Sequence, residues 1–307
     1  MENLTADENS TTDQQLFCPA GLYGVRLKIF ISALNIPLCV TAFLGNILII
    51  IAIKKVSSLR PPSKVLFSCL ATTDLCVGAI TQPLFAIFLA SPERSKLCFY
   101  VVVFFLTIGL IFCGVSLLTL TAISVDRLLA LLLGLRYRHV VTLRRVRIIV
   151  VTFWINCTFI AVTITYNPLI AGEMAFVILM LCIATSTFCY LKIYCTLRHR
   201  QTQVHHLGHE GQANGGGIPM NLARYKKTVS SALWLQLALM ASYFPQIILS
   251  FILRFHASTA STGFASAVAL TLLLFNSTLN PFLYCWKIKQ IRQVVKDTTR
   301  QFWCFSN

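Results

Sequence analysis

The side chains that could do chemistry in this chain are few and widely separated. Asp74 lies inside one long apolar segment, and the pair Asp126-Arg127 lies near the end of the next. The two carboxylates are too far apart to act as a paired general acid and base, and no serine has a histidine and a carboxylate at hand. Metal-ligand and phosphate-loop spacings are also missing from the sequence. These residues therefore favour ion pairing and ion coordination over an enzymatic reaction.

The elements that position these residues are long apolar segments. The chain has 307 residues, of which 56% are hydrophobic and 12% charged, and its mean hydropathy is +0.74. That is too little polar surface for a soluble globule. Backbone groups in hydrocarbon must be paired within their own segment, so apolar stretches of about 20 residues are predicted to be membrane-spanning helices. The predicted spans are residues 27–53, 65–89, 97–131, 146–166, 171–197, 228–253 and 263–286.

The distribution of basic residues predicts the orientation, because Lys and Arg concentrate in cytoplasmic loops. An extracellular N-terminus leaves nearly all of the 26 Lys and Arg residues on the cytoplasmic side. The polar tail of residues 1–26 has no cleavable signal sequence, and Asn3 and Asn9 are glycosylation acceptors within it. We therefore expect a multi-pass protein of the plasma membrane with a cytoplasmic C-terminus. The basic residues on the outer side are Arg26, Lys28, Arg94, Lys96 and Arg254.

The net charge of +16 could indicate binding of nucleic acid. The basic residues are instead dispersed over three loops and a tail that all adjoin the membrane. There they are attracted to the anionic lipid of the inner leaflet by about 1 kcal/mol each. Membrane lipids, not nucleic acid, are therefore the predicted partners of these charges.

Two cytoplasmic segments follow the fifth and seventh spans. Residues 199–223 include Gly215-Gly216-Gly217 and four histidines, and are predicted to be a flexible third intracellular loop. The histidines could hold a metal, but their irregular spacing favours solvated side chains. Residues 286–296 alternate apolar and basic residues at helical spacing, so residues 287–307 are predicted to be an amphipathic helix on the inner leaflet followed by a cytoplasmic tail. Cys304 within that segment is a candidate palmitoylation site, with an unmodified thiol as the alternative.

The spans contain a series of short motifs in a fixed order. With these motifs the chain resembles a rhodopsin-like (class A) G-protein-coupled receptor over nearly its whole length. The resemblance implies an all-α fold, a seven-transmembrane helix bundle with a short amphipathic eighth helix. The motifs are Gly45-Asn46, Leu70-Ala71-Thr72-Thr73-Asp74, Asp126-Arg127, Trp154, Phe244-Pro245, Asn276-Ser277 and Asn280-Pro281 with Tyr284.

The resemblance implies an activation switch at the cytoplasmic end. Asp126 holds Arg127 in the resting receptor, and Arg127 turns towards Tyr190 and Tyr284 on activation. An acid at the base of span six, a common second restraint, is missing from this sequence, which predicts basal activity. Three residues depart from the family pattern: Tyr243 replaces Trp, Cys182 replaces Pro and Leu128 replaces Tyr. The switch residues are Asp126, Arg127, Tyr190, Tyr243, Pro245, Asn280, Pro281 and Tyr284.

Asp74 is an acid deep in the membrane, where a carboxylate is costly unless it is neutralised or coordinated. By resemblance, Asp74, Ser116, Asn276 and Asn280 bind a sodium ion that favours the inactive state, with Asn46 and Ser277 nearby. The alternative is a protonated aspartate in a hydrated hydrogen-bond network. Sodium is the expected modulator, and no other cofactor is expected.

The cysteine usual in the second extracellular loop of this family is missing between Tyr166 and Met174. The disulfide that normally joins that loop to span three is therefore excluded. Cys18 and Cys98 are the cysteines on the outer side, and a bond between them is the available substitute.

The ligand-binding residues are expected in the outer half of the bundle. Gly109 stands where aminergic receptors have an aspartate, and span seven has no lysine for retinal before Trp286, so aminergic and opsin functions are excluded. The motifs are most similar to the adenosine, melanocortin and lipid-receptor branch. A small neutral or lipid-like ligand suits such an apolar pocket. The candidate ligand contacts are Gln82, Gly109, Tyr243, Gln246 and Ser250.

The predicted function is that of a receptor that binds an extracellular ligand and activates a heterotrimeric G protein. Leu135, in the second intracellular loop, and Arg127 are the predicted contacts with the G protein. A non-signalling decoy or scaffold receptor would keep the same fold. A seven-span transporter is a further alternative, although the paired halves typical of transporters are missing here.

Overall fold

The computed structural model describes residues 24–57, 59–93, 95–210, 241–249, 251–252, 260–287 and 289–305, which form helices and no strand. Six helical segments in this part of the chain are long and apolar enough to cross a membrane. Only residues 241–249 and 251–252 of the predicted sixth span are described, and they are helical. The predicted all-α, seven-helix membrane bundle is confirmed. The six segments are Val25–Lys55, Pro61–Ala90, Lys96–Val140, Leu143–Tyr166, Pro168–His199 and Thr262–Trp286.

The second span is interrupted by a π-helical turn. Helix α3 (Pro61–Cys76) starts with proline in its first turn, where the missing N–H costs nothing. The π turn η1 (Val77–Thr81) separates it from α4 (Gln82–Ala90). Pro83 explains the interruption, because its ring would clash with the carbonyl of Ala79 in a regular α-helix. The wider turn avoids that clash and changes the direction of the side chains that follow.

Helix α2 (Val25–Lys55) packs closely on this π turn. A Cβ added at Gly78 would lie 2.9 Å from the Cβ of Ala42 and 2.9 Å from the backbone N of Phe43. The Sγ of Cys39 donates to the carbonyl O of Gly78 at 2.9 Å. Only glycine permits this approach of α2 to the turn.

Helix α5 (Lys96–Leu133) is central and packs against α3, α4, α7 and α8. The side chain of Ser95 caps its start by accepting from the backbone N–H of Cys98 at 3.0 Å. The helix ends at Gly134, whose φ of +51° is in the left-handed region that favours glycine. The short turns η2 (Gly134–Arg136) and α6 (Tyr137–Val140) follow, and α7 (Leu143–Tyr166) leads back across the membrane.

A single residue, Asn167, connects α7 to α8 (Pro168–Glu210). Its backbone N–H donates to the carbonyl O of Thr163 at 2.8 Å, and its side-chain Oδ1 accepts from the N–H of Ile170 at 3.1 Å. Asn167 therefore ends one helix and caps the next, with Pro168 in the first turn of α8. The second extracellular loop is reduced to this one turn.

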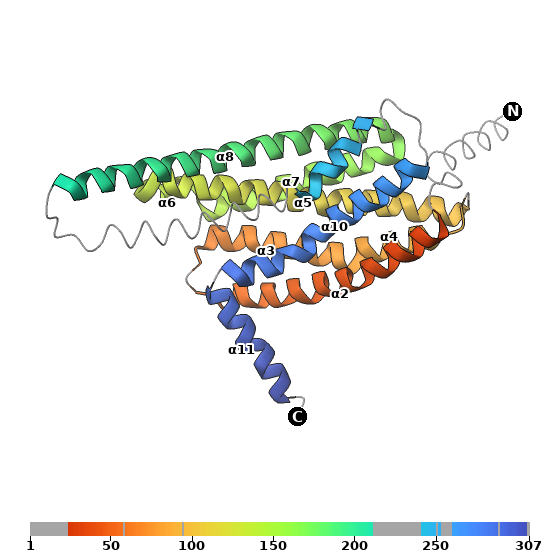
Figure 1. Cartoon of the computed structure of the whole chain (residues 1–307), viewed down its shortest axis with the longest axis horizontal. Coiled ribbons are helices and arrows are strands. Elements are labelled where there is room, and N and C mark those ends of the chain that lie inside the picture. The colour runs from red at the N-terminus through yellow and green to blue at the C-terminus, as the bar shows by residue number, and fades with distance from the viewer. Residues whose placement is uncertain are drawn as a thin grey trace.

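Helix α8 extends far beyond the ends of its neighbours (Figure 1). It continues through Glu210, so residues 199–210 are helical and not the flexible linker predicted from residue 199 onwards. The physical reason is composition: residues 198–210 contain no proline and one glycine, whereas the glycine run begins at Gly215. The side chains of the histidines at positions 205, 206 and 209 lie outside the described part, so the metal alternative stays untested.

The last span, α10 (Ala260–Lys287), leads into α11 (Lys289–Phe305). Helix α11 leaves the end of α10 at an angle to the long axis of the bundle (Figure 1). Ile291 is buried, whereas Arg292 and Gln293 beside it are exposed. This one-sided burial confirms the predicted amphipathic eighth helix.

Candidate functional site

Asp74 is fully buried at the centre of a polar layer that joins three helices. Its Oδ1 accepts from Ser277 Oγ at 2.8 Å and from Ser116 Oγ at 3.2 Å. Its Oδ2 accepts from Asn280 Nδ2 at 2.6 Å. Apolar clusters lie on either side, with Phe67 and Leu120 towards the C-terminal end of α5 and Phe85 and Phe105 towards its N-terminal end.

The oxygen atoms of this layer fit a hard cation. Asn46 donates to the carbonyl oxygens of Ala42 at 2.8 Å and Ser277 at 3.1 Å, and this leaves its Oδ1 buried without a partner. The Oδ1 of Asn280 is also buried and unpaired. A carboxylate beside two orphaned amide oxygens and two hydroxyls is a donor set suited to sodium. Asn276 is buried but, within the described residues, is not a donor to Asp74, whereas Ser277 is.

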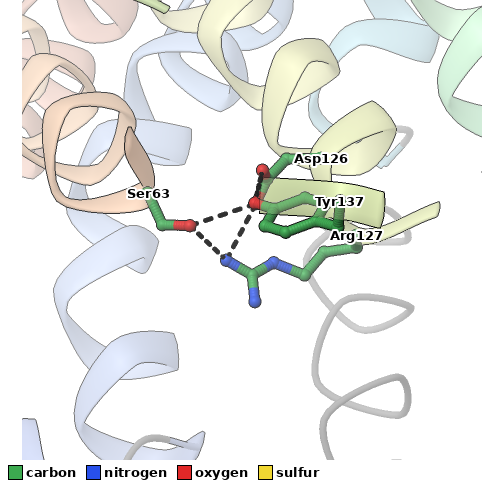
Figure 2. Close-up of polar contacts among 4 residues, drawn as sticks. All are labelled: Ser63, Asp126, Arg127 and Tyr137. Carbon is green, nitrogen blue, oxygen red and sulfur yellow. Dashed lines mark hydrogen bonds and ion pairs between the residues drawn. The ribbon is translucent and has the colours of Figure 1, made fainter. Parts of the chain in front are cut away.

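A second polar cluster lies at the C-terminal end of α5, the end that the basic residues predict to be cytoplasmic, and is formed by Ser63, Asp126, Arg127 and Tyr137 (Figure 2). Arg127 Nη2 lies 3.1 Å from Asp126 Oδ2. Ser63 Oγ donates to the same oxygen at 3.2 Å and accepts from Arg127 Nη2 at 3.2 Å. The Tyr137 hydroxyl donates to Asp126 Oδ1. We call these residues the cytoplasmic cluster.

Ser63 and Tyr137 were not predicted from the sequence. Ser63 stands in the first turn of α3, after the prolines that start that helix, and Tyr137 starts α6 after the turn at Gly134. The guanidinium carbon of Arg60 lies 4.9 Å from the centroid of the Tyr137 ring. The start of α3 and the segment that follows α5 therefore meet over Asp126. Tyr137 is revealed as a partner of Asp126 only by its burial in the folded protein, and nothing in the sequence indicates that burial.

Phe67 links the cytoplasmic cluster to α10. The guanidinium carbon of Arg127 lies 5.7 Å from the centroid of its ring, and Tyr284 meets the same ring edge-on at 5.4 Å. The hydroxyl of Tyr284 is buried without a hydrogen-bond partner. Two predicted switch residues, Arg127 and Tyr284, thus share one aromatic neighbour.

The other switch residues are placed along the core. Tyr190 is buried, and its hydroxyl oxygen accepts from Ser124 Oγ at 3.0 Å. Tyr243 is buried and donates to the carbonyl O of Cys113 at 3.5 Å, a long contact. Tyr243, Cys182 and Leu117 belong to one apolar cluster, as an apolar connector between pocket and cytoplasm requires. Pro245 lies in the described helical residues, and Pro281 lies inside α10.

The candidate ligand contacts differ in their surroundings. Gln82 is 1% exposed, and neither of its amide atoms has a hydrogen-bond partner. The Oε1 of Gln246 is also buried and unpaired. A Cβ added at Gly109 would lie 3.3 Å from Thr81 Cγ2, so α5 approaches η1 closely there. Ser250 lies outside the described residues.

The outer end of the bundle has two cross-links. Lys28 Nζ, at the start of α2, lies 3.0 Å from Glu93 Oε1 in the turn after α4. Cys98 forms a disulfide, and the nine other cysteines whose side chains are described are free. The partner of Cys98 therefore lies outside the described side chains, where Cys18 and Cys304 stand. Asn3 and Asn9 also lie outside the described residues.

At the opposite end, Leu135 is 96% exposed in the turn η2. Arg136 and Arg138 on either side of Tyr137 are exposed as well. A fully exposed leucine followed by a cation is therefore available to a partner, in the turn that leads directly to Tyr137 and its contact with Asp126.

Comparison with known proteins gives one family. Residues 45–170 match the family described as 7 transmembrane receptor (rhodopsin family). The chain is 26% identical over 277 residues to the adenosine receptor A3 of Ovis aries, over 82% of this chain and 84% of the relative. It is 27% identical over 279 residues to the adenosine receptor A3 of Canis lupus familiaris, over 82% of this chain and 85% of the relative.

The family match, the similarity along most of the chain, and the helical bundle agree with the motifs read from the sequence. They indicate a receptor and not an enzyme. The matched region includes Asp74 and the Asp126-Arg127 pair, whose contacts are described above. The chain is therefore similar to the rhodopsin family of seven-transmembrane receptors, and along most of its length to adenosine receptors, with helices that are long and apolar enough to cross a membrane several times.

Proposed function

We propose that this receptor binds a small neutral or lipid-like ligand in the outer half of its bundle and activates a heterotrimeric G protein through Arg127 and Leu135. The observation that carries the ligand class is that both amide atoms of Gln82 and the Oε1 of Gln246 are buried without hydrogen-bond partners within apolar helices. Carboxamides recognise neutral polar groups, whereas cations and anions need an opposite charge. The curated relatives are named adenosine receptors, which makes adenosine the first compound to test.

Signalling would follow from release of the cytoplasmic cluster. In the described state Arg127 contacts Asp126, Ser63 and Phe67. When span six moves outward, Arg127 would leave these contacts and turn towards Tyr190 and Tyr284, both buried at this end of the core. Pro245 and Pro281 allow their helices to bend, and Tyr243 would transmit ligand binding to them. Leu135 would enter an apolar groove of the G protein, since a 96% exposed leucine has no packing role of its own.

Sodium would act at Asp74 as a modulator of the resting state. Ser116, Ser277 and Asn280 contact the carboxylate, and the orphaned oxygens of Asn46 and Asn280 complete the donor set. A bound cation would neutralise the charge that this layer otherwise holds in a medium of low dielectric. Asn276, one turn before Asn280, would join the set through water.

The extracellular tail of residues 1–26 would carry glycans at Asn3 and Asn9, and Cys18 would pair with Cys98. Two observations support the pairing: Cys98 is disulfide-bonded, and Cys304 belongs to α11, at the opposite end of the bundle from the start of α5. Palmitoylation of Cys304 would anchor α11 to the inner leaflet as a second signal beside its basic residues.

The test of receptor function is ligand-free second-messenger output of the intact chain beside Arg127→Ala and Leu135→Ala variants, at matched surface expression. Loss of a basal signal in both variants is expected. Leu132→Ala is a matched control, because Leu132 is exposed on α5 but lies before the turn that presents Leu135. Equal output from all four chains would indicate the non-signalling decoy instead. The family match of residues 45–170 supports a receptor over the transporter alternative.

A further inference from the structure

The buried polar atoms without a hydrogen-bond partner in the outer half of the bundle include both amide atoms of Gln82 and Oδ1 of Asn35, beside Thr81 Oγ1 and Gln246 Oε1. Gln82 and Asn35 are each 1% exposed. A buried polar group without a partner loses the hydrogen bonds that it makes to water, so native proteins leave few such atoms unpaired. The three atoms of Gln82 and Asn35, on adjacent helices, require an explanation.

The contacts between α2 and η1 place Asn35 and Gln82 at one level. Cys39 Sγ donates to Gly78 O. Asn35 lies four residues before Cys39, and Gln82 lies four residues after Gly78. The helices run antiparallel, since a short connection joins α2 to α3. Helix α2 packs against both η1 and α4, so Asn35 and Gln82 lie on neighbouring helices, each about one turn, roughly 6 Å, further outward than the Cys39–Gly78 contact.

Helix α10 closes the third side. Asn35 Nδ2 donates to the carbonyl O of Ile31 at 2.9 Å and to Thr271 Oγ1 at 3.4 Å. Its two amide hydrogens are thus used, and Oδ1 is left as an acceptor. Gln82 adds an unused NH₂ donor and an unused carbonyl acceptor. Among the described residues of α2, η1 and α4, none within one turn of either amide is acidic or basic.

We propose that Asn35 and Gln82 form a subsite, the α2–α4 subsite, that binds a neutral ligand group with both a hydrogen-bond donor and an acceptor, such as a carboxamide, a urea or a nucleobase edge. The proposal rests on the proposed function and adds the place where the ligand's polar group is held. Its donor meets Asn35 Oδ1 or Gln82 Oε1, and its acceptor meets Gln82 Nε2. The apolar remainder of the ligand lies towards the stacked rings of Phe85, Phe88 and Phe105.

The experiment measures thermal unfolding of the purified intact receptor with a panel of neutral fragments that includes adenosine, nicotinamide and uracil. A second panel contains cations and anions of similar size, such as tyramine and benzoate. Wild type is compared with Gln82→Met, which keeps side-chain length but removes both unpaired atoms, and with Asn35→Leu. Thr107→Val is the matched control, because Thr107 donates to Val103 O within α5 at 2.8 Å and does not face α2.

At least one neutral compound is expected to raise the unfolding temperature of wild type and of Thr107→Val. Its apparent affinity should fall about tenfold or more in Gln82→Met and Asn35→Leu, because each removes a hydrogen bond to the ligand. Gln82→Met should also unfold at a higher temperature than wild type without ligand, since no partner is lost, so loss of folding does not obscure the test.

Three results would overturn the subsite. The first is a shift that Gln82→Met leaves unchanged, and the second is a panel in which only charged compounds, or none, raise the unfolding temperature. The third combines two observations: without ligand, Gln82→Met unfolds at a lower temperature than wild type, and no compound loses affinity when Gln82 is replaced. That result would indicate an ordered water that bridges the amides. The Arg127→Ala signalling assay uses no ligand, so the receptor function can hold while the subsite fails.

Discussion

The ring of Phe67 lies between Arg127 and Tyr284, 5.7 Å from the guanidinium carbon of the first and 5.4 Å, edge-on, from the ring of the second. One side chain of α3 therefore contacts functional residues of both α5 and α10. Arg127 and Tyr284 must both move if activation follows the proposed course. Phe67 is then a restraint that both movements have to overcome.

Replacing Phe67 by leucine is expected to raise ligand-free signalling. Leucine keeps an apolar side chain but loses the interaction of the ring with the Arg127 guanidinium, which is partly exposed and so contributes about 0.5–1 kcal/mol. The resting equilibrium should shift by about 2- to 5-fold. Second-messenger output at matched surface expression measures this. Phe112→Leu is the control, since Phe112 packs edge-on against Trp154 and not against Arg127; an equal rise in both variants would contradict the prediction.

Removing the Tyr137 hydroxyl is expected to destabilise the receptor. In Tyr137→Phe the buried carboxylate of Asp126 loses one of its donors, and a hydrogen bond to a charged group contributes about 1.5–3 kcal/mol. The unfolding temperature in detergent should fall, although the ring still faces Arg60. Tyr194→Phe is a suitable comparison because Tyr194 is exposed on α8. Unchanged stability of Tyr137→Phe would mean that its hydroxyl does not bond to Asp126.

Sodium is expected to stabilise the wild-type receptor against heat, relative to choline chloride at the same ionic strength. At ten times its dissociation constant the ion adds about 1.4 kcal/mol to the stability of the folded state. Asp74→Asn should abolish the difference between the salts, and Ser277→Ala should reduce it. Ser266→Ala, on α10 away from Asp74, should keep it. A sodium effect that survives Asp74→Asn would place the ion elsewhere.

Alanine at Gly78 is expected to be more harmful than alanine at Gly172. The added Cβ at Gly78 would lie 2.9 Å from the backbone N of Phe43, so α2 itself must shift, whereas nothing lies within 4 Å of a Cβ at Gly172. Overpacking of this kind costs about 1–3 kcal/mol. Thermal unfolding of the two variants measures the difference. Equal stability would show that α2 and the π turn separate easily.

The Cys18–Cys98 pairing predicts that the variants Cys18→Ser, Cys98→Ser and the double variant lose the same stability. A disulfide contributes about 2–4 kcal/mol, and either substitution removes all of it. Unfolding temperature and thiol labelling of the intact chain measure the loss. Cys195→Ser should have no effect, because Cys195 is free and exposed. Additive losses in the double variant would rule the pairing out.

The spans could be predicted from the sequence because they depend on residues within single helices, and the polar layer around Asp74, which joins three helices, could be predicted only through the family resemblance. Long apolar runs specify spanning helices, and Ser116 and Asn280 follow from the motifs that contain or adjoin them. Ser63 and Tyr137 could not be predicted as partners of Asp126. Their positions depend on where the chain emerges from the turn at Gly134 and on how α3 starts, which is a matter of packing between loops.

Two features of the helices were missed for a different reason. Hydrophobic periodicity does not distinguish an α turn from a π turn, so η1 was not predicted, although Pro83 marks its position. The predicted third loop starts too early, at residue 199, because the glycine run at Gly215 and the four histidines before it favour a linker, whereas α8 continues to Glu210. Helix propensity there is adequate, and the helix stays regular through Glu210.

The π turn has a consequence for comparing this receptor with its relatives. A π turn inserts one residue into a helix without lengthening the surface that the helix presents. In a relative whose second span has no π turn, the residue that is structurally equivalent to Gln82 therefore lies one residue closer in sequence to the equivalent of Asp74. Equivalent positions in the outer half of this span should be assigned by superposing backbones. An ungapped sequence alignment would match Gln82 to a residue one position away from its structural equivalent.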